Sequence, residues 1–310
     1  MTIFTRKNIN SKTLGILVLC SAIYLLIVWI LVGLKAENWL IIIVYNFFFL
    51  LSDSTRKFVA AFTVFIVFGI VYDLMKAYPN YRIQAIDVLQ VYGFEKKLFG
   101  IHSNGSILTP NEYFAINHKT FLDLLSGFFY INWMPIPIAL ALYFYFSNKL
   151  QFLHFSLTFL LTNLIGFCIY YIHPAAPPWY LAQYGSTVNF HTMGNPAGLA
   201  RFDEFFNIPI FHSIYSRNSN VFAAMPSLHS AYPIVVLFYA IKNKLGSINW
   251  FFGLFVFGIW FSAVYSGHHY VVDVIAGFVT AVVSIVVFQY ILLKNTSISN
   301  ILKRYEISIS

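Results

Sequence analysis

The chain has 310 residues, of which 59% are hydrophobic, 20% aromatic and only 10% charged, with a formal net charge of +8. A soluble globular domain carries about 25% charged residues, so this composition excludes a water-soluble domain and predicts an integral membrane protein. In such a protein the basic excess orients the membrane spans and meets anionic lipid. We therefore expect the bilayer as a partner and no nucleic acid.

Eight apolar segments are long enough to be candidate membrane-spanning helices. They lie near residues 14–34, 38–52, 58–75, 122–147, 151–173, 226–242, 249–266 and 270–293. The second segment is short for a full crossing, and a re-entrant segment is the alternative. The pattern predicts an all-α fold with about eight transmembrane helices.

The basic residues decide the orientation of these spans. With eight spans, short segments on one face carry Arg6, Lys7, Lys12, Arg56, Lys57, Lys149, Lys242, Lys244, Lys294, Lys303 and Arg304. Cytoplasmic loops carry such an excess of Lys and Arg, so both termini are predicted to be cytoplasmic.

Two long polar segments, residues 76–121 and 174–225, then face the other side. The first contains an amphipathic patch from Val91 to Ile101, which predicts a helix lying on the membrane surface. The second has about fifty residues and little periodicity, and a loop of that length is usually functional. A functional site would therefore open away from the cytoplasm.

The stretch Tyr-Ser-Gly-His-His-Tyr-Val-Val-Asp, residues 265–273, joins the last two apolar segments. If a helix begins here, His269 and Asp273 fall on one face, four residues apart. The carboxylate then accepts the N–H of one ring nitrogen and leaves the other as a nucleophile or base. Alternatively, two polar residues satisfy each other at a helix start, but desolvating both beside lipid is costly and favours catalysis.

A second histidine, His229, lies in Met-Pro-Ser-Leu-His-Ser at the mouth of the sixth apolar segment. Pro226 and Ser227 predict a helix N-terminus with Ser227 as its cap, and such a terminus attracts phosphate. His229 could serve there as general acid or base. A lone histidine is more often structural, but His229 shares a membrane face with His269. On a helix His268 would point about 100° away from His269, and phosphate contact and packing against the loop are equally open.

Arg201 and Arg217, in the second long segment, are the best-placed guanidinium groups to hold a phosphodiester, with ordinary surface arginines as the equal alternative. A zinc site built from the histidines of this region is disfavoured, because carboxylates are too few and the spacing fits no zinc pattern. We predict neither a metal nor another cofactor.

These motifs resemble the type 2 phosphatidic acid phosphatase superfamily, whose members use a His-x-x-x-Asp element for the nucleophile and a Pro-Ser-x-His element for the acid. By this resemblance His269 matches the nucleophile, Asp273 its orienting carboxylate, His229 the proton donor and Ser227 a phosphate-contacting serine. The sequence departs from the phosphatases at Ala263, where they have an arginine, and it lacks their Lys…Arg-Pro signature near residues 174–180. These departures argue against a simple phosphomonoesterase.

The altered pattern is similar to the inositol phosphorylceramide synthase branch of this superfamily, the fungal aureobasidin-target type. Leu228 replaces the phosphatase glycine within residues 224–230, and the similarity includes residues 94–100, 109–112, 175–180, 195–201 and 268–273. Residue usage rich in Ile, Phe, Tyr and Asn indicates a bacterial chain. We therefore expect an inner-membrane protein whose site faces the periplasm.

The resemblance implies a phosphotransferase that moves phosphoinositol from phosphatidylinositol to ceramide through a phosphohistidine intermediate. It also implies three parts: N-terminal transmembrane helices with the interfacial segment in residues 1–120, a catalytic transmembrane domain in residues 121–294 and a cytoplasmic tail in residues 295–310. The sequence makes no prediction of oligomeric state.

Two other functions remain open. A lipid phosphatase or phosphodiesterase would use the same residues and give the intermediate to water, although the missing arginine and the long aromatic segment 174–225 favour transfer. A channel or transporter needs polar residues in the middle of several spans. Here the ionisable residues cluster at segment ends on one face, which disfavours transport.

Overall fold

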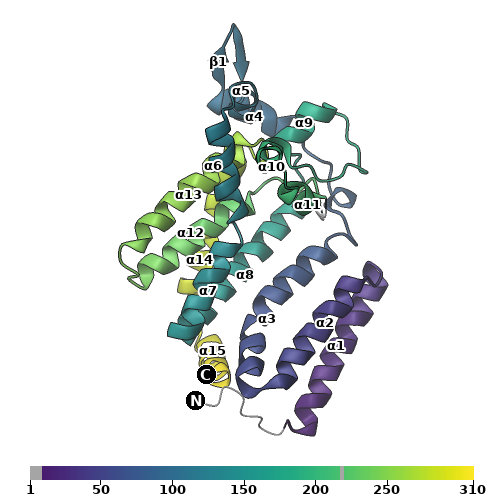
Figure 1. Cartoon of the computed structure of the whole chain (residues 1–310), viewed down its shortest axis with the longest axis vertical. Helices are drawn as coiled ribbons and strands as arrows, with labels where there is room; N and C mark the ends of the chain where they lie inside the picture. The colour runs from purple at the N-terminus through teal and green to yellow at the C-terminus, as the bar shows by residue number, and fades with distance from the viewer. Residues whose placement is uncertain (1–8, 217–219) are drawn as a thin grey trace.

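The computed structural model describes residues 9–216 and 220–310, and these residues are mostly helical (Figure 1). The apolar helices are α1 (Ser11–Leu31), α2 (Ala36–Leu51), α3 (Asp53–Leu74), α6 (Thr120–Ile131), α7 (Pro135–Ser147), α8 (Lys149–Ile172), α12 (Leu228–Lys242), α13 (Ile248–Tyr265) and α14 (Val271–Val286), which a π-helical turn (Val287–Leu292) extends. Among them, six segments are long and apolar enough to cross a membrane, with α6 and α7 counted as one, and α2 and α12 are shorter. The predicted all-α fold with about eight transmembrane helices is confirmed.

The fourth predicted segment forms two helices instead of one. α6 ends at Ile131, where the N–H of Asn132 bonds back to carbonyl groups of the helix. α7 begins at Pro135, which has no N–H to donate and suits the first position of a new helix. This break places Tyr130 in the last turn of α6 and Trp133 between the two helices, beside the functional site described below.

The centre of the bundle lies between α8, α12 and α14, with α3, α6–α7 and α13 around them and α1 and α2 at one edge (Figure 1). Because lipid is as apolar as the side chains, close packing and interhelical hydrogen bonds hold such helices together. The buried bonds join Thr158 to Tyr239, Thr162 to Ser284 and Tyr232 to Asn163.

Both long polar segments lie at one end of the bundle, the upper end in Figure 1, and α15 (Thr296–Ile309) lies at the other. They form α4 (Gln90–Phe99), β1 (Ile101–Ser103), β2 (Ser106–Leu108), α5 (Pro110–Ile116), α9 (Pro178–Tyr184), α10 (Ala200–Phe206) and α11 (Ile210–Tyr215), with 3-10 turns at Asn80–Arg82 and Ala197–Leu199. β1 and β2 form an antiparallel hairpin.

Backbone pairing ties the two long segments to each other. The N–H of Asp87 donates to the carbonyl of Pro174 at 2.8 Å, and the N–H of Ala176 donates to the carbonyl of Asp87 at 2.9 Å. Ala175 pairs in turn with the strand-like stretch at Ala223. The segments thus form one continuous cover over this end of the helices.

Candidate active site

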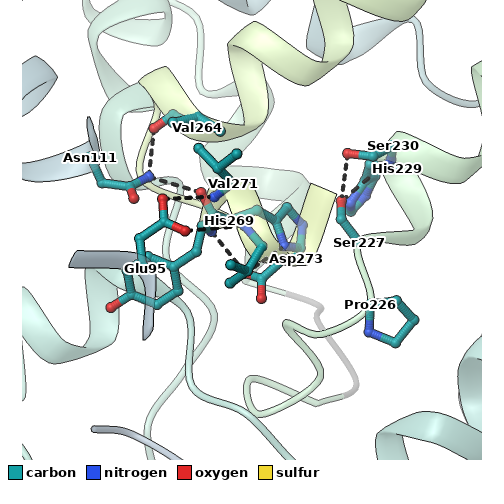
Figure 2. A network of polar contacts seen from close by, with 12 residues as sticks. Glu95, Asn111, Pro226, Ser227, His229, Ser230, Val264, His269, Val271 and Asp273 are labelled. Atoms are coloured by element: carbon teal, nitrogen blue, oxygen red, sulfur yellow. Dashed lines mark hydrogen bonds and ion pairs between the residues drawn. The ribbon is translucent and has the colours of Figure 1, made fainter. Parts of the chain in front are cut away.

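The motif of residues 265–273 folds into a turn followed by a helix, which corrects the expectation of a helix beginning at His269. α13 ends at Tyr265, and α14 begins only at Val271 after Tyr270, which is in an extended N-cap conformation. The physical reason is a cap: Asp273 Oδ2 accepts the Tyr270 N–H at 2.8 Å. His269 Nδ1 still lies 3.6 Å from Asp273 Oδ2, and both side chains are buried (Figure 2).

The second histidine is carried by the first turn of α12, and the predicted cap is confirmed. The Oγ of Ser227 accepts an N–H of this turn at 3.3 Å. The backbone N–H of Ser227 donates to the backbone oxygen of Asp273 at 2.9 Å. Gly277 permits this approach of the helices, because an added Cβ would lie 2.1 Å from the Ser227 carbonyl oxygen. The starts of α12 and α14 are therefore locked together, which sets His229 beside His269.

His229 and His269 line one cavity of about 330 Å³, with their ring centroids 5.7 Å apart. The walls are largely aromatic and include Phe68 of α3 and Phe167 of α8, which belong to membrane-spanning helices. Since Nδ1 of His269 faces Asp273, its Nε2 is the nitrogen available for reaction. An apolar cavity that ends at two imidazoles suits a lipid with a polar head group.

Tyr130 of α6, which no sequence motif marks, orients the ring of His229. Its hydroxyl lies 3.2 Å from His229 Nδ1, and Trp133 stands edge-on to the same ring at 4.8 Å between centroids. With Nδ1 engaged, Nε2 of His229 is left for proton transfer. Aromatic residues are frequent throughout the apolar segments, so no sequence signal separates these two from the rest.

His268 lies in the turn and not on a helix, which corrects the orientation expected for it. Its Nε2 is 2.9 Å from the carbonyl oxygen of Pro196, and its ring stacks on Tyr215 at 4.3 Å. Burial, with a smaller effect of nearby His269, lowers the pKa of His268 to about 3. A neutral His268 that donates to Pro196 therefore joins the turn to the second long segment, while it also lines the cavity.

Arg201 is engaged by a carboxylate of the protein itself. Its Nε lies 2.5 Å from Asp123 Oδ1, and its guanidinium lies over the ring of Tyr265 at 5.5 Å. This ion pair ties α10 to α6, and Arg201 is not among the described residues that line the cavity. Its contact with substrate stays a prediction. Arg217 lies outside the described residues.

Two of the three departures from the phosphatase pattern lie at closely packed positions. Leu228 fits against Gly166 of α8, where an added Cβ would lie 2.6 Å from the leucine side chain. Ala263 is fully buried, and its carbonyl accepts the N–H groups of both His268 and His269. Neither Lys nor Arg occurs among the described residues that line the cavity. The side-chain donors of the described lining are therefore histidine N–H groups together with Tyr, Trp and Asn groups.

The arrangement has the parts of a nucleophile and an acid–base pair: a histidine backed by a carboxylate and a second histidine across a cavity. In the part of the chain that the structure describes, no three His, Cys, Asp or Glu residues are grouped to hold a metal. Fold and site together define an integral membrane protein with a buried histidine pair at one end of a helical bundle.

The family follows from comparison with known sequences. Residues 107–287 match the family model described as the PAP2 superfamily, and the chain belongs to this superfamily.

Three relatives show how far the similarity extends. The chain is 45% identical over 301 residues to the phosphoinositol dihydroceramide synthase of Bacteroides thetaiotaomicron. This match covers 96% of the chain and 97% of the relative. It is 39% identical over 131 residues to the inositol phosphorylceramide synthase catalytic subunit AUR1 of Saccharomyces cerevisiae and 29% identical over 260 residues to the inositol phosphorylceramide synthase of Candida albicans. These matches cover 41% and 81% of this chain but only 31% and 51% of the fungal proteins. No solved structure matches the chain significantly.

Proposed function

We propose that this chain is a phosphotransferase that moves phosphoinositol from phosphatidylinositol to ceramide, with His269 as the nucleophile. The observation that carries the proposal is the pair of imidazoles on one cavity of about 330 Å³, one of them backed by a buried carboxylate. The relative that matches nearly the whole chain is named a phosphoinositol dihydroceramide synthase, which supports phosphoinositol as the transferred group and a ceramide as the acceptor.

The first half-reaction releases diacylglycerol. Nε2 of His269 attacks the phosphorus of phosphatidylinositol, a P–N bond forms, and the bond from phosphorus to the diacylglycerol oxygen breaks. Asp273 stabilises the positive charge that develops on the His269 ring. Protonated His229 gives its Nε2 proton to the departing oxygen, and Tyr130 holds the ring for that transfer.

The second half-reaction transfers the group to ceramide. Neutral His229 takes the proton of the primary hydroxyl of ceramide, the hydroxyl oxygen attacks phosphorus, and the P–N bond to His269 breaks. The balance is complete, since His229 ends protonated and His269 ends free. A largely aromatic cavity limits the access of water, which otherwise hydrolyses the intermediate.

The net charge of the cavity favours a phosphodiester over a phosphomonoester. A phosphodiester carries one negative charge, which protonated His229 can balance, whereas a dianionic phosphomonoester would need a further cation in a site of low dielectric. The described lining offers no Lys or Arg for that purpose. Phosphate contacts from Ser227, His268, Arg201 and Arg217 stay predictions.

The distribution of charge supports a periplasmic location for the site. Nine described basic residues lie at the end of the bundle that carries α15: Lys12, Arg56, Lys57, Lys149, Lys242, Lys244, Lys294, Lys303 and Arg304. Seven lie at the end that carries the histidine pair, and six of these belong to the two long polar segments, where charge has less influence on orientation than in short connections. Arg6 and Lys7 lie outside the described residues. By the positive-inside rule both termini are cytoplasmic and the histidine pair faces the periplasm. The division of the chain into an N-terminal part, a catalytic domain and a tail, with boundaries at residues 120 and 294, also stays a prediction.

The experiment is lipid mass spectrometry on the purified protein given phosphatidylinositol, with and without ceramide. Inositol phosphorylceramide and diacylglycerol that form only when ceramide is present support the transferase. Diacylglycerol and inositol phosphate that accumulate without ceramide would mean that water is the acceptor and the chain is a hydrolase. No turnover under either condition would contradict phosphatidylinositol as the donor.

A further inference from the structure

Glu95, a carboxylate to which the sequence motifs assign no role, lies fully buried beside the histidine turn. It belongs to α4, and the stretch that matches the family model begins only at residue 107. Its Oε1 accepts the N–H of Val271 at 2.9 Å, and its Oε2 accepts the N–H of Val272 at 3.1 Å (Figure 2). These N–H groups open α14 and have no partner within the helix. Glu95 therefore caps α14 from a position 176 residues away in sequence.

Burying a carboxylate costs free energy unless its partners replace the hydrogen bonds that it made to water. Burial raises the pKa of Glu95, and the hydrogen bonds from Val271 and Val272 act in the opposite direction. The positive end of the α14 dipole also favours a negative group at this position. The groups that stabilise the Glu95 carboxylate all belong to the first turn of α14, so these two hydrogen bonds fix the position of that turn.

Asn111 of α5 makes a second connection to the same turn. Its Nδ2 donates to the carbonyl oxygen of Val264 at 2.7 Å and to that of His269 at 2.8 Å (Figure 2). On the other side, the N–H of His269 donates to the carbonyl oxygen of Ala263 at 3.0 Å. The backbone of His269 is therefore held at both its N–H and its carbonyl group.

We propose that Glu95 and Asn111 are positioning residues for His269, and that the segment before the catalytic helices clamps the turn that carries it. This inference rests on the proposed role of His269 as the nucleophile. His269 lies outside α14 and Asp273 lies inside it, so their 3.6 Å separation depends on the turn and not on helix geometry. Glu95 sets where α14 starts, and Asn111 sets where the His269 backbone lies.

The clamp acts on the chemical step more than on substrate binding. Neither Glu95 nor Asn111 is among the described residues that line the cavity. Loss of either bond lets His269 shift relative to Asp273 and to the reacting phosphorus. A misplacement of about 1 Å costs about 100-fold in rate. The expected signature is a lower kcat with an unchanged KM.

The test compares full-length Glu95→Gln, Glu95→Ala and Asn111→Ala with the wild type in nanodiscs. The burst of diacylglycerol from phosphatidylinositol counts competent sites, and the subsequent rate per site gives kcat with ceramide as acceptor. We expect kcat per site to fall by about 100-fold in Glu95→Ala and less in Glu95→Gln, which keeps one acceptor oxygen. Lys97→Gln, at an exposed position of the same helix, is the control with wild-type kcat.

A second readout does not depend on the substrate. The rate at which diethyl pyrocarbonate modifies His269, measured by mass spectrometry against exposed His191 in the same molecule, reports the reactivity of the ring. We expect this ratio to fall in the Glu95 and Asn111 variants and to stay constant in Lys97→Gln. If the wild type does not turn over phosphatidylinositol, the proposed function fails, and this ratio alone then decides the positioning role.

Two results would overturn the inference. One is a wild-type kcat per site and a wild-type modification ratio in Glu95→Gln and Asn111→Ala. The other is a loss confined to the burst amplitude, because fewer competent molecules with normal turnover mean that the bonds serve folding only. If Glu95→Ala does not fold, Glu95→Gln and Asn111→Ala still give the decision.

Discussion

The contact between Gly277 and Ser227 allows a sharp test of how the two histidines are brought together. In Gly277→Ala the new Cβ would lie 2.1 Å from the Ser227 carbonyl oxygen. Non-bonded atoms prefer separations of about 3.5 Å, so α12 and α14 must separate by more than about 1 Å at their starts. The obstacle is backbone, which cannot rotate away as a flexible side chain can.

We expect two measurable consequences of Gly277→Ala. Overpacking of this kind lowers the free energy of unfolding by about 1–3 kcal/mol. The widened gap between His229 and His269 lowers kcat by about 100-fold. The assay is the diacylglycerol burst and the turnover rate per site, together with thermal unfolding in the same detergent.

Gly253→Ala is the matched control for this prediction. Gly253 lies within α13, and nothing is within 4 Å of an added Cβ there. Replacing a helical glycine with alanine where there is room stabilises by about 0.5–1 kcal/mol, so this variant should keep full activity. A Gly277→Ala protein with the turnover of Gly253→Ala would refute the idea that this contact sets the distance between the histidines.

Four further predictions concern the site and its surroundings. His269→Ala should abolish turnover and His229→Ala should lower kcat by about 10²- to 10⁴-fold, both with wild-type thermal unfolding; a fully active variant of either contradicts the mechanism. His268 has a pKa of 6.5 when unfolded and about 3 when folded, so the unfolded state binds the extra proton. The free energy of unfolding should therefore fall as the pH drops from 6.5 towards 3. In His268→Gln the midpoint of thermal unfolding should depend less on pH over this range. Activity should survive EDTA, and inhibition that zinc reverses would revive a metal site. A reporter fused after Ser310 should be cytoplasmic, whereas a periplasmic signal would contradict the topology.

The sequence by itself determined the class of protein and the local parts of the site. Apolar segments of sufficient length must become helices in a bilayer, because only internal hydrogen bonds satisfy the backbone there. Ser227 before a helix start was readable as a cap, and the spacing of His269 and Asp273 brought the two together even though α14 starts later than expected. These features depend on residues within four positions of one another.

Tertiary structure decided everything that depends on distant residues. The cap from Glu95 joins residues 176 positions apart, and the Asn111 bond to His269 joins residues 158 positions apart. One weak signal existed for Glu95: it lies four residues after Val91 on the face of an amphipathic helix that packs inward, where a charge needs a partner. Periodicity shows which face of a helix is apolar, but it does not show what that face will meet. Partners of this kind are set by how whole helices pack, and that is why the clamp on His269 emerged only from the fold.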